Sequence, residues 1–138
     1  GDESMNTIEQ LKVGEGIAPV QLPPVTPDVL VQYAEASGDH NPIHLDEDEA
    51  KRLGLPGIIA HGMWTMGNLA KLVTPYYEEG FLQDYQIRFR GMVFLGDIVT
   101  LQAKLESKDD QLLTFQVSAS NQSGADVLKG KAIFRLAQ

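Results

Sequence analysis

Apolar and polar residues alternate with a period of two through most of the second half of the chain, as in strands that bury one face. The alternation covers four segments separated by turn-forming residues, at residues 82–93, 98–105, 112–119 and 126–136. Just before them, residues 61–73 are apolar almost all round, so we expect a helix that the rest of the protein encloses. This helix would extend to Glu79 if Pro75 only kinks it. An enclosed helix followed by four antiparallel strands predicts an α+β fold in which a curved sheet wraps a long central helix.

The first half of the chain is expected to hold shorter elements. Residues 17–22 can form one strand. Thr26 and Pro27 are a strong helix start, because threonine caps the first turn and proline suits the first helical position. Gly38 would end this helix in a left-handed conformation. A second short helix is expected over residues 46–52, where acidic side chains open the first turn and basic side chains close the last.

The composition fits a single globular domain. We expect residues 5–138 to form it, with residues 1–4 as a cloning remnant ahead of a natural start at Met5. The net charge of −8 argues against nucleic acid as a partner, because its phosphates demand a basic surface. The chain has no cysteine, which excludes disulfides and thiolate chemistry and fits a reducing compartment, so we expect a cytoplasmic protein. No uncharged apolar run is long enough to span a membrane.

The three histidines of the chain lie close together in the sequence, at His40, His44 and His61. Asp39 and His44 are five residues apart, across a turn that Pro42 stiffens. Such a turn can bring a carboxylate and an imidazole to one water molecule, and histidine can act as both base and acid near neutral pH. The pair therefore suits the addition of water to a double bond, or its removal, and we expect neither side chain in the core.

Gly62 stands at the expected start of the enclosed helix. The N–H groups of a first helical turn have no partner within the helix and lie at the positive end of its dipole. A glycine at this place lets a substrate carbonyl approach one of these N–H groups closely. Such a contact would stabilise an enolate as an oxyanion hole does, where the loss of one donor costs about 2.7–4 kcal/mol.

The motif Gly-Asp-His-Asn-Pro-Ile-His at residues 38–44, followed by Ala-His-Gly-Met at residues 60–63, resembles the MaoC-like family of R-specific enoyl-thioester hydratases and dehydratases. The resemblance implies a hot-dog fold and a dimer with two related sites, with a homodimer expected and a heterodimer as the alternative. It also implies an acyl thioester substrate, carried by coenzyme A or by the phosphopantetheine of an acyl carrier protein, and no further cofactor. By the same resemblance, Asp39 and His44 are the catalytic pair and the Gly62 amide polarises the thioester carbonyl.

The resemblance predicts a lyase that reversibly hydrates trans-2-enoyl thioesters to (R)-3-hydroxyacyl thioesters. Two other functions remain open. A hot-dog thioesterase would place a carboxylate near or on the central helix, but the first acidic residues after His61 are Glu78 and Glu79, late in that helix. A non-catalytic acyl-binding subunit of a heterodimeric dehydratase would have lost Asp39 or His44, and both are present.

The candidate residues of the turn also have purely structural interpretations. Asp39 could only cap a turn, His44 could be a structural histidine, and His40 is expected to be solvated. The spacing of His40 and His44 would suit a metal only on a helix, which Pro42 prevents. We therefore expect no metal site.

Five further residues are expected to contact the substrate: His61, Met63, Trp64, Arg88 and Arg90. His61 has the alternative of setting the helix start. Trp64 stands where the resemblance leads us to expect a leucine-sized residue, and it faces either the core, which we favour, or the acyl pocket. Arg88 and Arg90 share one face of a strand, where they are either solvated or meet the phosphates of the substrate's carrier.

Overall fold

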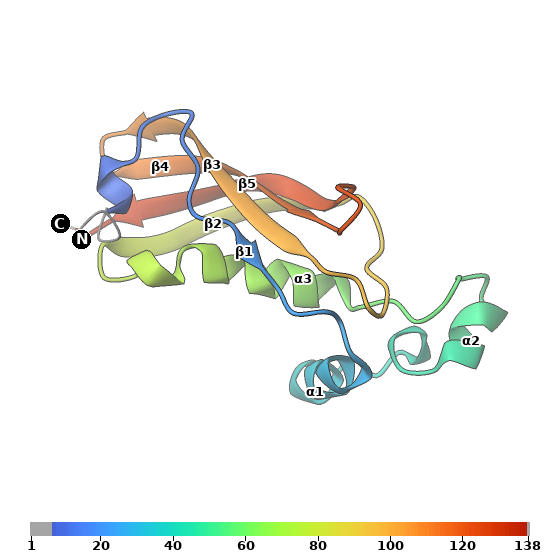
Figure 1. The fold of residues 1–138 in the computed structure, drawn as a ribbon. Helices are drawn as coiled ribbons and strands as arrows, with labels where there is room; N and C mark the ends of the chain where they lie inside the picture. The colour runs from blue at the N-terminus through green and yellow to red at the C-terminus, as the bar shows by residue number, and fades with distance from the viewer. Residues whose placement is uncertain (1–6, 138) are drawn as a thin grey trace.

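The structure is a computed structural model that describes residues 7–137. Its main body is a five-stranded antiparallel sheet with the strand order β1-β3-β4-β5-β2 (Figure 1). The strands are β1 (Val20–Gln21), β2 (Gly80–Phe89), β3 (Thr100–Asp109), β4 (Leu112–Ser120) and β5 (Asp126–Leu136). The four alternating segments are therefore strands of one curved sheet, as predicted. The expected remnant at residues 1–4 and the start at Met5 lie outside the described residues.

A helical run lies along one face of this sheet, which curves around it (Figure 1). The run consists of the α-helix α3 (Gly62–Asn68) and two 3-10 helices, η4 (Leu69–Leu72) and η5 (Thr74–Tyr76). The predicted long helix is thus present as a helical path, but only its first seven residues are α-helical. The Asn68 side chain donates a hydrogen bond to the Trp64 carbonyl at 2.8 Å and so competes with the backbone N–H that would continue the α-helix. Pro75 has no N–H to donate, so the later turns are 3-10 rather than α-helical.

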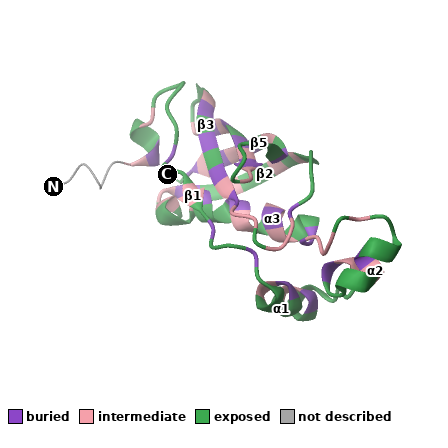
Figure 2. Ribbon diagram, turned by 45° about the vertical axis from the view of Figure 1, so that its right-hand side comes forward, coloured by how far each residue is buried: buried purple, intermediate pink, exposed green. Residues whose placement is uncertain are grey.

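The inner face of the sheet and one side of the helical run form the core (Figure 2). Buried side chains alternate along β3 at Leu101, Ala103 and Leu105. Leu69 and Leu72 from the helical run join the same core and are each 2% exposed. The opposite side of the run is open in this single chain, where Met63 is 56% exposed. The helix is therefore covered on one side rather than enclosed all round, because the sheet wraps only one of its faces.

The helix α1 (Pro27–Ser37) lies on the side of the helical run away from the sheet, and α2 (Glu47–Arg52) lies beyond the α3 end of the run, with the 3-10 turn η3 (Pro42–His44) between them in the chain (Figure 1). Thr26 caps α1, and Gly38 ends it in the left-handed region with a φ of 80°, both as predicted. In the described part of the chain, no helix is long and apolar enough to cross a membrane.

The segment that leads into α3 is held from two sides. The Ile59 N–H donates to the Ile43 carbonyl at 3.1 Å. The next N–H, from Ala60, donates to the Val93 carbonyl at 2.7 Å. These bonds tie the loop after α1, the start of α3 and the connection after β2 into one assembly, so side chains from all three can share a site.

Candidate active site

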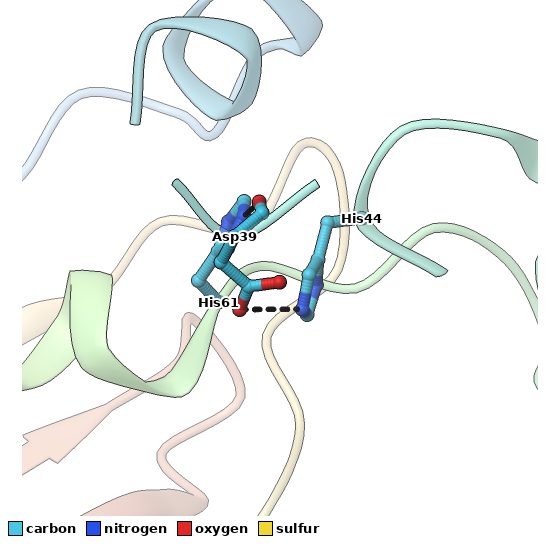
Figure 3. Close-up of side chains that lie close together, drawn as sticks. All are labelled: Asp39, His44 and His61. Carbon is cyan, nitrogen blue, oxygen red and sulfur yellow. Dashed lines mark hydrogen bonds and ion pairs between the residues drawn. The ribbon is translucent and has the colours of Figure 1, made fainter. Parts of the chain in front are cut away.

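Three separate pieces of the chain bring Asp39, His44 and His61 together (Figure 3). Asp39 follows the end of α1, His44 closes η3, and His61 immediately precedes α3. One potential ligand atom from each side chain lies within 4.8 Å of the other two. The predicted pair is therefore assembled, and a third residue joins it.

Asp39 divides its two carboxylate oxygens between a turn and the pair. Its Oδ1 accepts the Asn41 N–H at 3.2 Å, which closes an Asx turn. Its Oδ2 lies 3.8 Å from His44 Nε2, the contact drawn as a dashed line in Figure 3. The structural and the catalytic interpretations of Asp39 are thus compatible, because each uses a different oxygen.

His44 is held so that one ring nitrogen is free to take a proton. Its Nδ1 lies 2.8 Å from the Ile59 carbonyl oxygen, and since a carbonyl can only accept, Nδ1 carries the hydrogen. In the neutral ring, Nε2 then carries the lone pair and faces Asp39. His44 is only 8% exposed, so the expectation that neither member of the pair is buried is wrong for His44. The bond to Ile59 and a ring contact with His61 hold it against the chain that enters α3.

His61 is packed behind the pair and is 1% exposed. Its Nε2 donates to the main-chain carbonyl of Asp39 at 3.0 Å. Its ring stacks on that of His44, with the centroids 3.9 Å apart and the planes inclined by 26°. Its Nδ1 is buried and has no hydrogen-bond partner among the described residues, an arrangement that typically costs about 1–3 kcal/mol.

The three side chains have the composition of a metal site, but the stacking of the two rings works against one. Histidine binds a metal through a lone pair that lies in the plane of its ring, at about 2.0–2.1 Å for zinc. The rings of His44 and His61 lie face to face, so their in-plane lone pairs do not converge on one ion. The arrangement suits acid–base chemistry at a single free imidazole nitrogen better than coordination.

A cavity of about 160 Å³ opens beside His44. Its lining includes Gly62, Thr65, Phe89, Met92 and Val127. Gly62 is the first residue of α3, where the N–H has no partner within the helix. A Cβ added at this glycine would lie 3.1 Å from the Phe89 ring, so the backbone here is approached closely. His44 and Gly62, whose amide is the predicted carbonyl-binding group, therefore line the same cavity.

Three of the residues that we expected to contact the substrate, Met63, Trp64 and His61, are not among the described residues that line this cavity. Met63 faces outward on the open side of the helical run. Trp64 is half-buried and packs against the hydrophobic core, the placement that we favoured for it. His40 is exposed, as expected.

Arg88 and Arg90 line a different hollow, of about 520 Å³, together with Lys129 and Lys131. Because Ile87 packs against the core, its neighbour Arg88 faces the outer side of the sheet, and Lys129 is its partner on β5. Each lysine also has an acidic side chain nearby, at 3.8 Å for Lys129 and 3.1 Å for Lys131. The hollow is nevertheless locally basic on a chain whose net charge is −8. We call these four cations the basic hollow.

Several residues around the site were not predicted from the sequence. The alternation that turns Arg88 outward also turns Phe89 inward, so that signal was available for Phe89. The two lysines of the basic hollow gave no such signal, because their position opposite β2 depends on a strand register that the sequence does not reveal.

The chain matches a known protein family over most of its length. The family description "MaoC like domain" matches residues 9–125. The mitochondrial 3-hydroxyacyl-[acyl-carrier-protein] dehydratase of Arabidopsis thaliana is 25% identical over 127 residues, which cover 88% of this chain and 75% of that protein. Other curated relatives are much longer, and the chain spans 28% or less of three of them.

Two solved structures illustrate the likeness of the fold. The R-hydratase PhaJ1 from Pseudomonas aeruginosa superposes with a TM-score of 0.86 at 25% identity, covering 94% of this chain and 84% of that one. A chain of the ChsH1-ChsH2 complex from Mycobacterium tuberculosis superposes with a TM-score of 0.82 at 22% identity, covering 91% and 98%. The hot-dog fold predicted from the motif is thereby confirmed.

Proposed function

Because this chain belongs to the MaoC-like family of hydratases and dehydratases, we propose that it is a hydro-lyase that reversibly hydrates trans-2-enoyl thioesters to (R)-3-hydroxyacyl thioesters. One observation carries the proposal to this particular chain. The Nδ1–H of His44 is tied to the Ile59 carbonyl, which leaves Nε2 as a free base 3.8 Å from the Asp39 carboxylate. A base and a carboxylate at this separation can share one water molecule.

In the direction of hydration, Asp39 orients the water and His44 Nε2 takes one of its protons. The water oxygen forms a bond to C3 of the enoyl group, and the electrons of the double bond move through C2 to the thioester oxygen. The Gly62 N–H donates to this enolate oxygen. The protonated His44 then returns its proton to C2, so one water molecule is added and the enzyme regains its starting state. Dehydration follows the same steps in reverse.

The thioesterase alternative receives no support from the position of the acidic residues after His61. Glu79 lies beyond the end of η5 and accepts the Ile8 N–H with both oxygens, at 3.0 and 3.2 Å. It therefore serves the packing of the N-terminal segment at the far end of the helical run. The non-catalytic alternative would need the Asp39–His44 arrangement to be inactive, which the first assay below addresses.

The direct test is turnover of crotonyl-CoA by the purified chain. We expect the ultraviolet absorbance of the enoyl thioester to fall, with (R)-3-hydroxybutyryl-CoA as the product on chiral chromatography. Formation of free coenzyme A without hydration would support the thioesterase alternative. No turnover of crotonyl-CoA or of longer enoyl thioesters would contradict the proposal.

The cytoplasmic location stays a prediction, which cell fractionation tests.

We further propose that the basic hollow receives the phosphates of the carrier arm, so that coenzyme A or phosphopantetheine enters as part of the substrate. Arg88 and Arg90 line the hollow on the outer side of the sheet, and Phe89 between them lines the cavity on the inner side, so the carrier arm would have to pass around the end of β2 to reach both. Arginine and lysine bind phosphate through charge-assisted hydrogen bonds.

Replacing the hollow's charges should weaken binding without slowing the chemistry. For Arg88→Ala with Lys129→Ala, we expect KM for crotonyl-CoA to rise about tenfold with kcat unchanged, equivalent to ~1.4 kcal/mol. Crotonyl-N-acetylcysteamine, which has no phosphate, should show no change between the variant and the wild type. Lys51→Ala, which removes an exposed lysine on α2, is the matched control. An equal rise in KM for both substrates would contradict a phosphate site.

We also propose that the working enzyme is a dimer built at β2. This ten-residue strand ends the sheet order, and β5 is its one partner strand among the described residues; such edges recruit further strands. Phe81 and Phe89 on this strand are 55% and 53% exposed. The cavity of about 160 Å³ is also smaller than most ligand sites, at ~300–1,000 Å³, so a second chain would complete it.

Light scattering should therefore give twice the mass of the chain at micromolar concentration. Phe81→Glu should shift the protein toward monomers and lower its activity, because a charge would have to be buried at the interface. Val13→Glu is the matched control, since Val13 is an apolar residue that is 61% exposed outside β2. An active wild-type monomer would contradict the dimer, and a monomer that becomes active only with another protein would point to a heterodimer.

A further inference from the structure

His61 makes contacts with the reacting pair that the proposed mechanism does not use. It is 1% exposed and does not line the cavity, so it is not placed to touch the substrate. Burying a histidine with one unpartnered nitrogen is unfavourable, and a leucine or phenylalanine would fill the same space without that penalty. The contacts that His61 makes therefore need a reason beyond the filling of space.

The first contact holds the main chain of Asp39. His61 Nε2 donates to the Asp39 carbonyl at 3.0 Å, across 22 residues of sequence. The other hydrogen bonds at Asp39 are local, because they link it to Ser37 and Asn41, two residues away on either side. The bond from His61 thus joins this loop to the start of α3 and fixes how far the carboxylate stands from the rest of the site.

The second contact holds the ring of His44. The His61 ring stacks on it at 3.9 Å, while its other ring contact, with Tyr33 of α1, is 4.8 Å between centroids. The hydrogen bond from Nδ1 to Ile59 also holds the His44 ring, but the ring could still tilt about it. Stacking on a buried ring restricts that tilt and keeps Nε2 directed toward Asp39.

We propose that His61 is a positioning residue that holds Asp39 and His44 at their working separation, a role that rests on the proposed function of that pair. One side chain reaches both partners, and it directly precedes Gly62, whose amide is the third group of the mechanism. A displacement of reacting groups by about 1 Å can lower the reaction rate ~10²-fold, so a residue that holds both Asp39 and His44 in place is expected to have a large effect on kcat.

The two contacts can be separated by substitution. His61→Gln keeps an N–H donor within reach of the Asp39 carbonyl but removes the ring. His61→Phe keeps a ring to stack on His44 but removes the donor. His61→Ala removes both, and His40→Ala is the matched control, since His40 is an exposed histidine directly after Asp39.

We expect His61→Ala to lower kcat about 10–100-fold with KM for crotonyl-CoA within about twofold of the wild type. Gln and Phe should each restore part of the loss, and His40→Ala should leave kcat unchanged. If His61→Ala does not fold, the Gln and Phe variants carry the test. Wild-type kcat in folded His61→Ala, or in both His61→Gln and His61→Phe, would overturn the proposal. So would losses that follow only the folded fraction, with no rescue by Gln or Phe.

A measurement without substrate separates failure of this proposal from failure of the proposed function. In the wild type, the His44 ring should give one sharp set of NMR signals, with Nδ1 protonated in the neutral form. In His61→Ala these signals should broaden or split, while the backbone spectrum remains that of a folded protein. Unchanged His44 signals would overturn the positioning role even if the wild type proved inactive on every enoyl thioester.

Discussion

Asp39→Asn and His44→Ala are each expected to lower kcat on enoyl thioesters by at least ~10²-fold, the low end for acid–base catalysis. His44→Ala removes the imidazole nitrogen that faces the Asp39 carboxylate, and with it the group proposed to move the proton between water and C2. Asp39→Asn removes the charge that orients the water and stabilises the protonated ring. The asparagine can still accept the Asn41 N–H through its Oδ1, so the turn should survive.

Steady-state kinetics on crotonyl-CoA together with melting curves check this prediction. Because His44 is buried, His44→Gln is a useful second variant if His44→Ala proves poorly folded. Asp46→Asn is the matched control for the loss of a carboxylate, since Asp46 also accepts a backbone N–H through Oδ1, at 3.2 Å from Glu49. Near-normal turnover by the enzyme with either substitution would contradict the catalytic role of the residue that was replaced.

The strands could be predicted because their signal is local. Alternation is a property of neighbouring residues, and each of the four predicted segments contains a strand of the structure. However, β2 begins and ends earlier than expected, and β3 begins and ends later. The helical run was less predictable. Its apolar composition indicated burial, but the sequence does not reveal which of its faces the sheet covers, and Met63 proves to be exposed. The change from α-helix to 3-10 helix depends on the competition that Asn68 introduces.

The site divides in the same way. Asp39 and His44 could be paired from the sequence because a single proline-stiffened turn separates them. The contacts of His61 could not be predicted in this way, because its bond to the Asp39 carbonyl spans 22 residues and forms only when the start of α3 packs behind the loop. The burial of His44 has the same origin, since Ile59 and His61 come to it from the later segment. Long-range packing therefore decides what local motifs leave open.

Gly62→Pro should lower kcat by ~10²–10³-fold relative to Gly62→Ala, which corresponds to the ~2.7–4 kcal/mol lost with one oxyanion donor. The comparison isolates the amide hydrogen, because both variants add a Cβ and only proline removes the N–H. Proline is well tolerated at the first position of a helix, where Gly62 lies. The preceding residue is also compatible, since His61 has φ −60° and ψ 130°, in the extended region that proline demands of its neighbour.

The alanine variant measures the steric part of the change. A Cβ at residue 62 would lie 3.1 Å from the Phe89 ring, which is 53% exposed and can shift by the few tenths of an ångström required. We therefore expect Gly62→Ala to raise KM modestly and Gly62→Pro to act mainly on kcat, with similar melting temperatures for both. Equal kcat values for the two variants would show that this amide does not stabilise the enolate, and the oxyanion donor would then have to be sought elsewhere along the cavity.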